Sequence, residues 1–129
     1  AVSNNLPILA KIKSTAINGC PPELMGLGPI GASKKALKRA ELKISDIDII
    51  ELNEAFASQS LACIKELNIN PDKVNTEGGA IALGHPLGMS GVRLVLSAML
   101  ELKYSKQQFA LCTMCVGVGQ GISLLIERV

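Results

Sequence analysis

Strand-like and helix-like segments alternate along this chain, and that alternation restricts its fold more than any other feature. Alternating apolar and polar residues predict a strand over residues 6–18, and a β-branched run predicts a second, buried strand over residues 47–52. Two more strands are predicted near the end of the chain, over residues 109–116 and 121–126. The pattern is typical of an α/β fold in which helices pack on a mostly parallel sheet, here ending in an antiparallel pair.

Apolar residues at helical spacing predict three helices between these strands. The first covers residues 33–42 and has lysines on its opposite face. The second covers residues 54–67, and its expected inner stripe is Phe56, Leu61, Ile64 and Leu67. The third, residues 90–102, is apolar on most sides and is therefore expected to be buried. A glycine-rich segment, residues 75–91, precedes it and contains the only histidine.

Composition indicates one globular domain spanning residues 1–129. Hydrophobic residues make up 48% of the chain and charged residues 19%, so a packed core is feasible. Aromatic residues are only 2%, which argues against nucleic-acid binding by base stacking. The one dense basic cluster lies at helical spacing and indicates a solvated helix face. Its members are Lys34, Lys35, Lys38 and Arg39.

The sequence predicts a cytoplasmic protein that does not bind membranes. No apolar run approaches the length of a membrane span, and the first residues lack the build of a signal peptide. The four cysteines, at positions 20, 63, 112 and 115, are too scattered to indicate a disulfide framework, which fits a reducing compartment.

Two short motifs admit a functional and a structural interpretation. Residues 26–31, GLGPIG, match the glycine pattern of dinucleotide-binding loops, but no strand directly precedes them, so a loop that begins a helix is the alternative. Cys112 and Cys115 match C-x-x-C. On a strand, residues three apart point to opposite faces, which disfavours a redox pair and leaves Cys112 as a core residue. A zinc site would need two more ligands, and no paired spacing supplies them, so no metal site is predicted.

Three other positions are better candidates for chemistry. Cys115 ends a predicted strand beside Gly117, whose N–H could face a developing oxyanion. His85 lies in the glycine-rich loop next to Pro86, a setting that often carries function. Asn53 follows the strand over residues 47–52, where open α/β sheets place ligands, although it could simply cap the next helix.

Taken in order, these segments resemble the thiolase family. Residues 53–56, NEAF, resemble one family motif; residues 84–86, GHP, within GGAIALGHPLGMSG, resemble a second; and residues 115–117, CVG, resemble a third. The segment PELMGLGP, residues 22–29, is also similar to the family. The resemblance covers only the C-terminal half of a thiolase and implies its mixed, mostly parallel five-stranded sheet with helices on both faces. The ending looks most like the degradative 3-oxoacyl-CoA and 3-oxoadipyl-CoA thiolases.

The resemblance implies an acyltransferase that makes or cleaves 3-oxoacyl-CoA through an acyl-cysteine intermediate. His85 would activate the nucleophilic cysteine and donate to a thioester oxygen, and Asn53 would hold a water at that oxyanion site. Cys115 would move the proton on the α-carbon, and the Gly117 N–H would serve a second oxyanion site. Phe56 and Met25 would line the acyl or pantetheine pocket.

The resemblance also implies partners. The substrates would be acyl-CoA and CoA, with no separate cofactor. The nucleophilic cysteine and the loop domain belong to the N-terminal half, so the 129 residues alone are expected to be inactive and to expose an apolar sheet face. The full-length protein is expected to be a homodimer or homotetramer. A thiolase-like module for binding or assembly, without chemistry, is the alternative; the presence of Asn53, His85 and Cys115 together argues against it.

Overall fold

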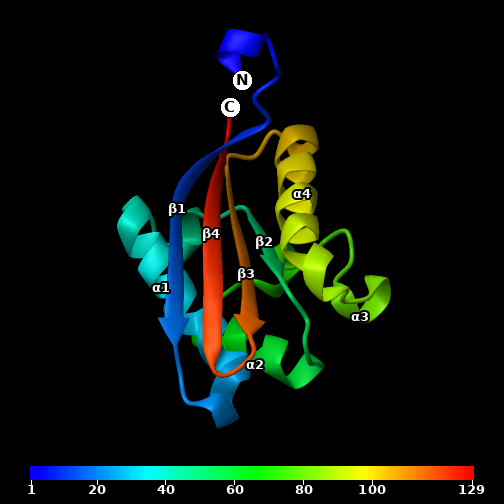
Figure 1. The fold of residues 1–129 in the computed structure, drawn as a ribbon. Helices are drawn as coiled ribbons and strands as arrows, with labels where there is room; N and C mark the ends of the chain where they lie inside the picture. The colour runs from blue at the N-terminus through cyan, green and yellow to red at the C-terminus, as the bar shows by residue number, and fades with distance from the viewer.

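The computed structural model describes residues 1–129, in which four strands form one sheet (Figure 1). The strands are β1 (Ala10–Gly19), β2 (Ile49–Leu52), β3 (Phe109–Val116) and β4 (Gln120–Arg128), in the order β1-β4-β3-β2. Only β2 and β3 are parallel; β4 runs antiparallel to both of its neighbours. The four predicted strands and the antiparallel pair at the end of the chain are confirmed. Strands β1, β2 and β3 point the same way, but only one of the three pairings is parallel, because β4 lies between β1 and β3.

The sheet has no fifth strand, and the one further pairing is a single parallel bridge between Ile50 and Val74. A 3₁₀ turn, Pro71–Lys73, directly precedes Val74, and Asn75 follows it with a left-handed φ of 49°. Both conformations depart from the extended backbone, so only one residue can pair with β2. The five-stranded prediction is therefore wrong by one strand, and the edge of the sheet lies beside the loop that carries Asn75.

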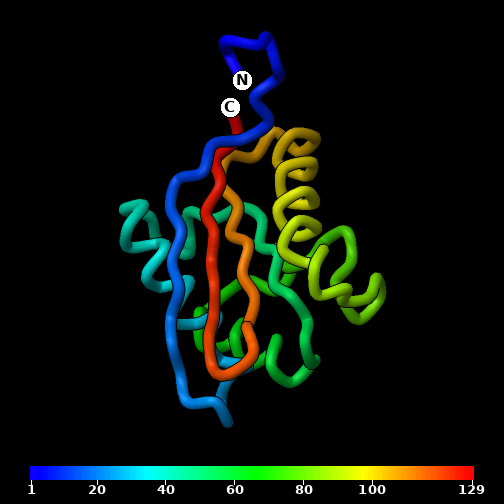
Figure 2. Tube along the Cα trace, viewed as in Figure 1, coloured from blue at the N-terminus to red at the C-terminus, as the bar shows by residue number.

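Helices cover the two faces of the sheet unequally (Figures 1 and 2). Helices α1 (Gly28–Ala40) and α2 (Ala57–Glu66) share one core with the sheet, and α4 (Leu87–Ser105) forms a second core on the other face. The short α3 (Ala80–Leu83) precedes α4. Four 3₁₀ turns complete the chain: Val2–Asn4, Pro22–Leu27, Ile44–Asp46 and Pro71–Lys73. None of the helices is both long enough and apolar enough to span a membrane.

The inner faces of two helices differ from the sequence prediction. Phe56 and Leu61 are 63% and 66% exposed, because α2 begins only at Ala57 and turns smaller side chains inward. Leu67 is buried as predicted. In α4 the buried apolar residues recur every fourth position, at Leu94, Ala98 and Leu102. Val95 and Met99 are partly buried against the same core. Five further apolar side chains of α4 are exposed: Leu87, Met89, Val92, Leu96 and Leu100. The prediction of a helix buried on most sides is therefore wrong for this chain.

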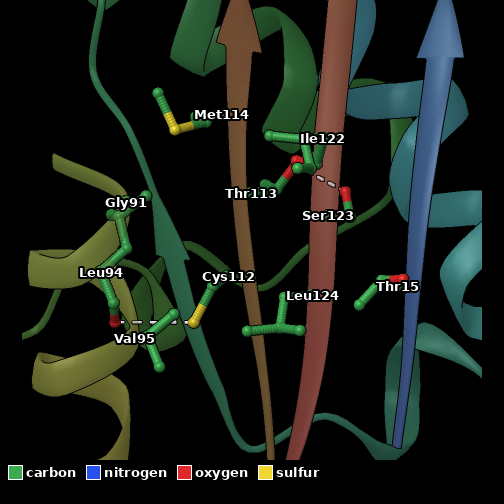
Figure 3. Close-up of a pocket in the computed structure, with 10 residues that line it drawn as sticks. All are labelled: Thr15, Gly91, Leu94, Val95, Cys112, Thr113, Met114, Ile122, Ser123 and Leu124. Atoms are coloured by element: carbon green, nitrogen blue, oxygen red, sulfur yellow. Dashed lines mark hydrogen bonds between the residues drawn. The ribbon is translucent and has the colours of Figure 1, made fainter. Parts of the chain in front are cut away.

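The sheet face that carries α4 is only partly covered, since α4 lies over β2 and β3 and leaves much of β4 and β1 open (Figure 1). Ile12 and Ile17 of β1 are more than 60% exposed, and Ile122 of β4 is 39% exposed. A hollow of about 210 Å³ lies between the strands of this face and α4. Figure 3 shows the side chains that line it, which come from the strands and from α4. The expected apolar sheet face is therefore present.

Candidate active site

The structure brings Asn53 and His85 together, although 31 residues separate them in the chain. Asn53 directly follows β2, and its N–H donates to the Thr113 carbonyl of β3 at 3.0 Å. His85 lies between α3 and α4. The Asn53 Nδ2 is 3.4 Å from the His85 Nε2, and the His85 Nδ1 is 2.5 Å from the Ser90 Oγ in the first turn of α4. Both ring nitrogens of the imidazole thus have a partner.

The hydrogen-bond directions indicate which nitrogen of His85 carries the proton. The Ser90 hydroxyl lies 3.1 Å from the Pro86 carbonyl, which can only accept, so Ser90 donates there and accepts from the His85 Nδ1–H. The Nε2 lone pair then accepts from the Asn53 amide. In this tautomer Nε2 is the basic nitrogen, and it lies on the side of Asn53.

Asn53 has capacity for one more interaction. Its side chain is fully buried, yet its Oδ1 has no hydrogen-bond partner in the protein. A buried amide oxygen without a partner is costly in a folded protein. Asn53 does not cap α2 with its side chain, so the structural alternative for this residue is not supported.

Cys115 occupies the last part of β3 and is buried, at 6% exposure. Burial raises the pKa of its thiol above the ordinary value of 9.0, so the thiol is protonated near neutral pH. Cys112, by contrast, packs in the core beneath α4, and burial raises its pKa as well. All four cysteines are free, and no group of three or more potential ligands is placed to hold a metal ion. The interpretation of Cys112 as a core residue is confirmed.

Gly117 begins the turn that joins β3 to β4. No atom lies within 4 Å of the position that a Cβ would take on Gly117, and its N–H takes no part in the backbone hydrogen bonds of the turn. The next two residues, Val118 and Gly119, have left-handed φ values of 69° and 90°. A β-branched residue rarely adopts this conformation, so the turn beside Cys115 is strained at Val118.

Backbone contact fixes this turn against the start of α1. A Cβ on Gly121 would lie 2.0 Å from the carbonyl carbon of Gly28, and a Cβ on Gly28 would lie 2.4 Å from the Gln120 carbonyl oxygen. A Cβ on Gly26 would likewise meet the Gln59 side chain at 2.7 Å. Glycines of the GLGPIG segment thus allow close packing within the protein, which favours the helix-start interpretation over a dinucleotide loop.

The two residues predicted to line a substrate pocket take no part in the hydrogen bonds of the Asn53–His85 pair. Met25 is half-buried in the turn Pro22–Leu27, where its carbonyl lies near the Cys20 thiol. Phe56 is extended and 63% exposed just before α2. Their role in substrate binding stays a prediction.

Sequence reasoning missed the side chains that hold Asn53 and His85 in place. Ser90 was expected only as the start of a helix, and its contact with the His85 Nδ1 depends on α4 beginning at Leu87. Glu54 and Asn75 bond to each other and to backbone on both sides of the site. The position of Ser90, a polar residue in the first helical turn after His85, is a weak sequence signal for this contact. No sequence signal pointed to the role of Asn75.

The four-stranded sheet has helices on both faces. Asn53 follows one parallel strand, Cys115 ends the other, and His85 lies in the loop between α3 and α4. This combination of fold and residues is that of a thiolase-type domain. The family described as "Thiolase, C-terminal domain" matches residues 6–128. The chain therefore belongs to the thiolase family and represents its C-terminal domain.

Individual relatives agree with this assignment. The chain is 54% identical over its whole length to the 3-oxoadipyl-CoA/3-oxo-5,6-dehydrosuberyl-CoA thiolase of Escherichia coli (strain K12), and it covers 33% of that protein. It is 57% identical over 93% of its length to the Pseudomonas aeruginosa beta-ketoadipyl-CoA thiolase, of which it covers 30%. The crystal structure of human mitochondrial 3-ketoacyl-CoA thiolase superposes with a TM-score of 0.97 at 43% identity, covering 99% of this chain and 32% of that one. The chain thus spans about a third of the length of these relatives.

Proposed function

We propose that this chain is the C-terminal part of an acetyl-CoA C-acyltransferase that makes or cleaves a 3-oxoacyl-CoA. The contact between the Asn53 amide and the His85 imidazole carries the proposal, because it places a buried donor beside a half-buried base. The nucleophilic cysteine that forms the acyl-enzyme would come from the remainder of the full-length protein.

His85 and Asn53 would act together at a thioester oxygen. With Nδ1–H bonded to Ser90, Nε2 can take the proton of the nucleophilic cysteine once that thiol replaces the Asn53 amide at its lone pair. The resulting Nε2–H can then donate to a thioester oxyanion. The unpartnered Oδ1 of Asn53 can hold a water that completes the donor set. Preorganised donors of this kind are typically worth about 3 kcal/mol each in the transition state.

Cys115 would supply and remove the proton on the α-carbon. Burial keeps its thiol protonated, which suits the delivery of a proton to a carbanion; the reverse step requires a base, which the substrate-bound site would have to generate. The Gly117 N–H, unused within the turn, would face the second developing oxyanion.

The substrates would be CoA and acyl-CoA, and the rest of the protein would cover the open sheet face. A human mitochondrial 3-ketoacyl-CoA thiolase whose structure was determined in complex with CoA superposes with a TM-score of 0.97. The exposed apolar residues of α4, β1 and β4 form a surface of the kind that another part of a protein covers. We assign this surface to the remaining two thirds of the full-length protein.

The test replaces Cys115 by alanine in the full-length protein. Carbon–carbon cleavage of acetoacetyl-CoA should fall by about 100-fold or more, which is the contribution of a general acid–base group. Acyl transfer from acetyl-CoA to the enzyme cysteine, followed by mass spectrometry, should persist in part. Cys112→Ala is the matched control, because that thiol lies on the opposite face of the same strand. Equal loss of both steps would contradict the role of Cys115, and an inactive wild-type enzyme would favour the non-catalytic alternative.

A further inference from the structure

Glu54 connects the two loops that carry Asn53 and His85. Its Oε1 accepts from the Asn75 side-chain amide at 3.2 Å, and its Oε2 accepts from the Ile81 backbone N–H at 2.9 Å. Glu54 is the residue after Asn53, and Ile81 lies four residues before His85. One carboxylate therefore spans the gap between the two candidate site loops, with its two oxygens on two different donors.

The loop has a shape that admits this carboxylate. A Cβ on Gly79 would lie 2.3 Å from the carboxyl carbon of Glu54, so any larger residue would displace it. Gly79 has an extended φ of −107°, so no conformational need for glycine exists at this position. The absence of a side chain at Gly79 therefore serves the approach of Glu54.

Asn75 completes the connection at the edge of the sheet. The Leu52 N–H donates to its Oδ1 at 2.9 Å, and its Nδ2 donates to the Leu52 carbonyl at 2.8 Å and also to Glu54. The Asn75 backbone N–H donates to the Ile50 carbonyl at 2.9 Å. The side-chain amide thus takes the place of the next residue of an edge strand and fixes where β2 ends, one residue before Asn53.

From these contacts we infer that Glu54 and Asn75 are positioning residues for the Asn53–His85 pair. They hold the Asn53 amide against the His85 Nε2 by binding β2 on one side and the loop before His85 on the other. The expected effect of Glu54 and Asn75 on turnover rests on the proposed function. Their effect on the imidazole follows from the geometry alone.

The experiment uses Asn75→Gly in the full-length protein. Glycine accepts the left-handed φ of 49°, so this variant removes the amide without adding backbone strain. Asn68→Gly is the matched control, because Asn68 is exposed, has a φ of 52° and makes no side-chain hydrogen bond. Glu54→Gln is a second, milder variant that keeps one acceptor, and Glu66→Gln on the exposed side of α2 is its control.

Two readouts separate positioning from general stability. For Asn75→Gly, kcat for acetoacetyl-CoA cleavage should fall by about 10- to 100-fold, the cost of misplacing a catalytic pair by about 1 Å, with the KM for CoA changed less than kcat. Glu54→Gln should give a smaller decrease. In ¹⁵N-histidine NMR spectra, assigned with His85→Gln, the Nε2 resonance of His85 should shift in both variants and in neither control.

Each outcome decides the matter. A fall in kcat with an unchanged Nε2 resonance would overturn the inference and leave Glu54 and Asn75 as structural residues. An unchanged resonance and unchanged kcat would overturn it as well. If the wild-type enzyme had no thiolase activity, the proposed function would fail. A shifted Nε2 resonance in the two variants would still support the positioning role.

Discussion

The candidate site has two halves, and a different kind of interaction stabilises each of them. The amide half comprises Asn53 and His85 and is built from side-chain hydrogen bonds. Ser90 bonds to His85, while Asn75 and Glu54 bond to each other and to the backbone of Leu52 and Ile81. In the hairpin half, which comprises Cys115, the turn from Gly117 to Gly119 and the start of β4 up to Gly121, backbone packs directly against backbone. Cys115 itself pairs with Gly121 across the two strands.

This difference indicates how each half should respond to substitution. Hydrogen bonds can lengthen or exchange partners, and each typically contributes about 1 kcal/mol, so damage to the amide half should be graded. Close contact between two backbones leaves no room for an added methyl group, so damage to the hairpin half should be abrupt.

The largest effect is expected in the hairpin half, from Gly121→Ala. The new Cβ would lie 2.0 Å from the Gly28 carbonyl carbon, and neither backbone can move without separating α1 from β4. We expect the free energy of unfolding to fall by about 3 kcal/mol or more, measured by urea denaturation. Gly19→Ala is the control, since Gly19 ends the neighbouring strand and has no atom within 4 Å of its Cβ position. Similar stabilities for the two variants would show that the contact is not tight.

The next effect depends on pH and is expected in the amide half, where Glu51 lies two residues before Asn53. Glu51 is fully buried and pairs with Arg93 of α4 at 3.3 Å, but its Oε1 has no partner. Burial, with a further contribution from Glu101, raises the Glu51 pKa from 4.5 to about 7, although Arg93 acts in the opposite direction. The folded state therefore binds a proton more tightly than the unfolded state.

The sign of the pH effect follows from this difference. Between pH 4.5 and about 7 the folded state holds the Glu51 proton and the unfolded state releases it, so stability falls as the pH rises through this window. The full loss corresponds to about 3 kcal/mol at 1.36 kcal/mol per pH unit. Glu51→Gln should flatten this dependence, measured by urea denaturation at pH 5 and pH 7.5. Glu66→Gln, on the exposed side of α2, should leave it unchanged. An equal slope in Glu51→Gln and wild type would refute the assignment.

The sequence predicted the elements of this fold better than their arrangement. The strand expected over residues 109–116 coincides with β3. The apolar run begins at Phe109, and the glycines at 117 and 119 mark its end. The pairing of the strands was harder to predict. Strand β1 pairs with β4, whose residues lie more than 100 positions further along the chain, and no local pattern encodes that pairing. No fifth strand forms beside β2, because the backbone leaves the extended conformation at Asn75, directly after the single bridge at Val74.

The candidate site was predictable in its central residues and not in their support. Asn53 and His85 stand out by residue type and by their position after a strand or in a glycine-rich loop. Glu54 looked like an ordinary helical residue, and its function as a link appears only when the loop from Asn75 to Ile81 lies beside it. The sequence also did not distinguish the buried from the exposed positions of α4, because apolar residues occupy both of its faces.

The smallest effect, and the only stabilising one, is expected at Val118 in the hairpin half. Its side chain is 84% exposed and its φ is 69°, so valine gains little burial there while adopting a conformation that β-branched residues avoid. Val118→Asn places a residue that tolerates this conformation directly before Gly119, the pair preferred in tight hairpin turns. We expect an increase of about 0.5–1 kcal/mol in the free energy of unfolding. Val118→Ala is the control, because alanine keeps the Cβ that strains the turn and should gain less. If asparagine is no more stabilising than alanine, the backbone conformation of this turn is not a source of strain, and the contrast between the two halves rests on the glycine contacts alone.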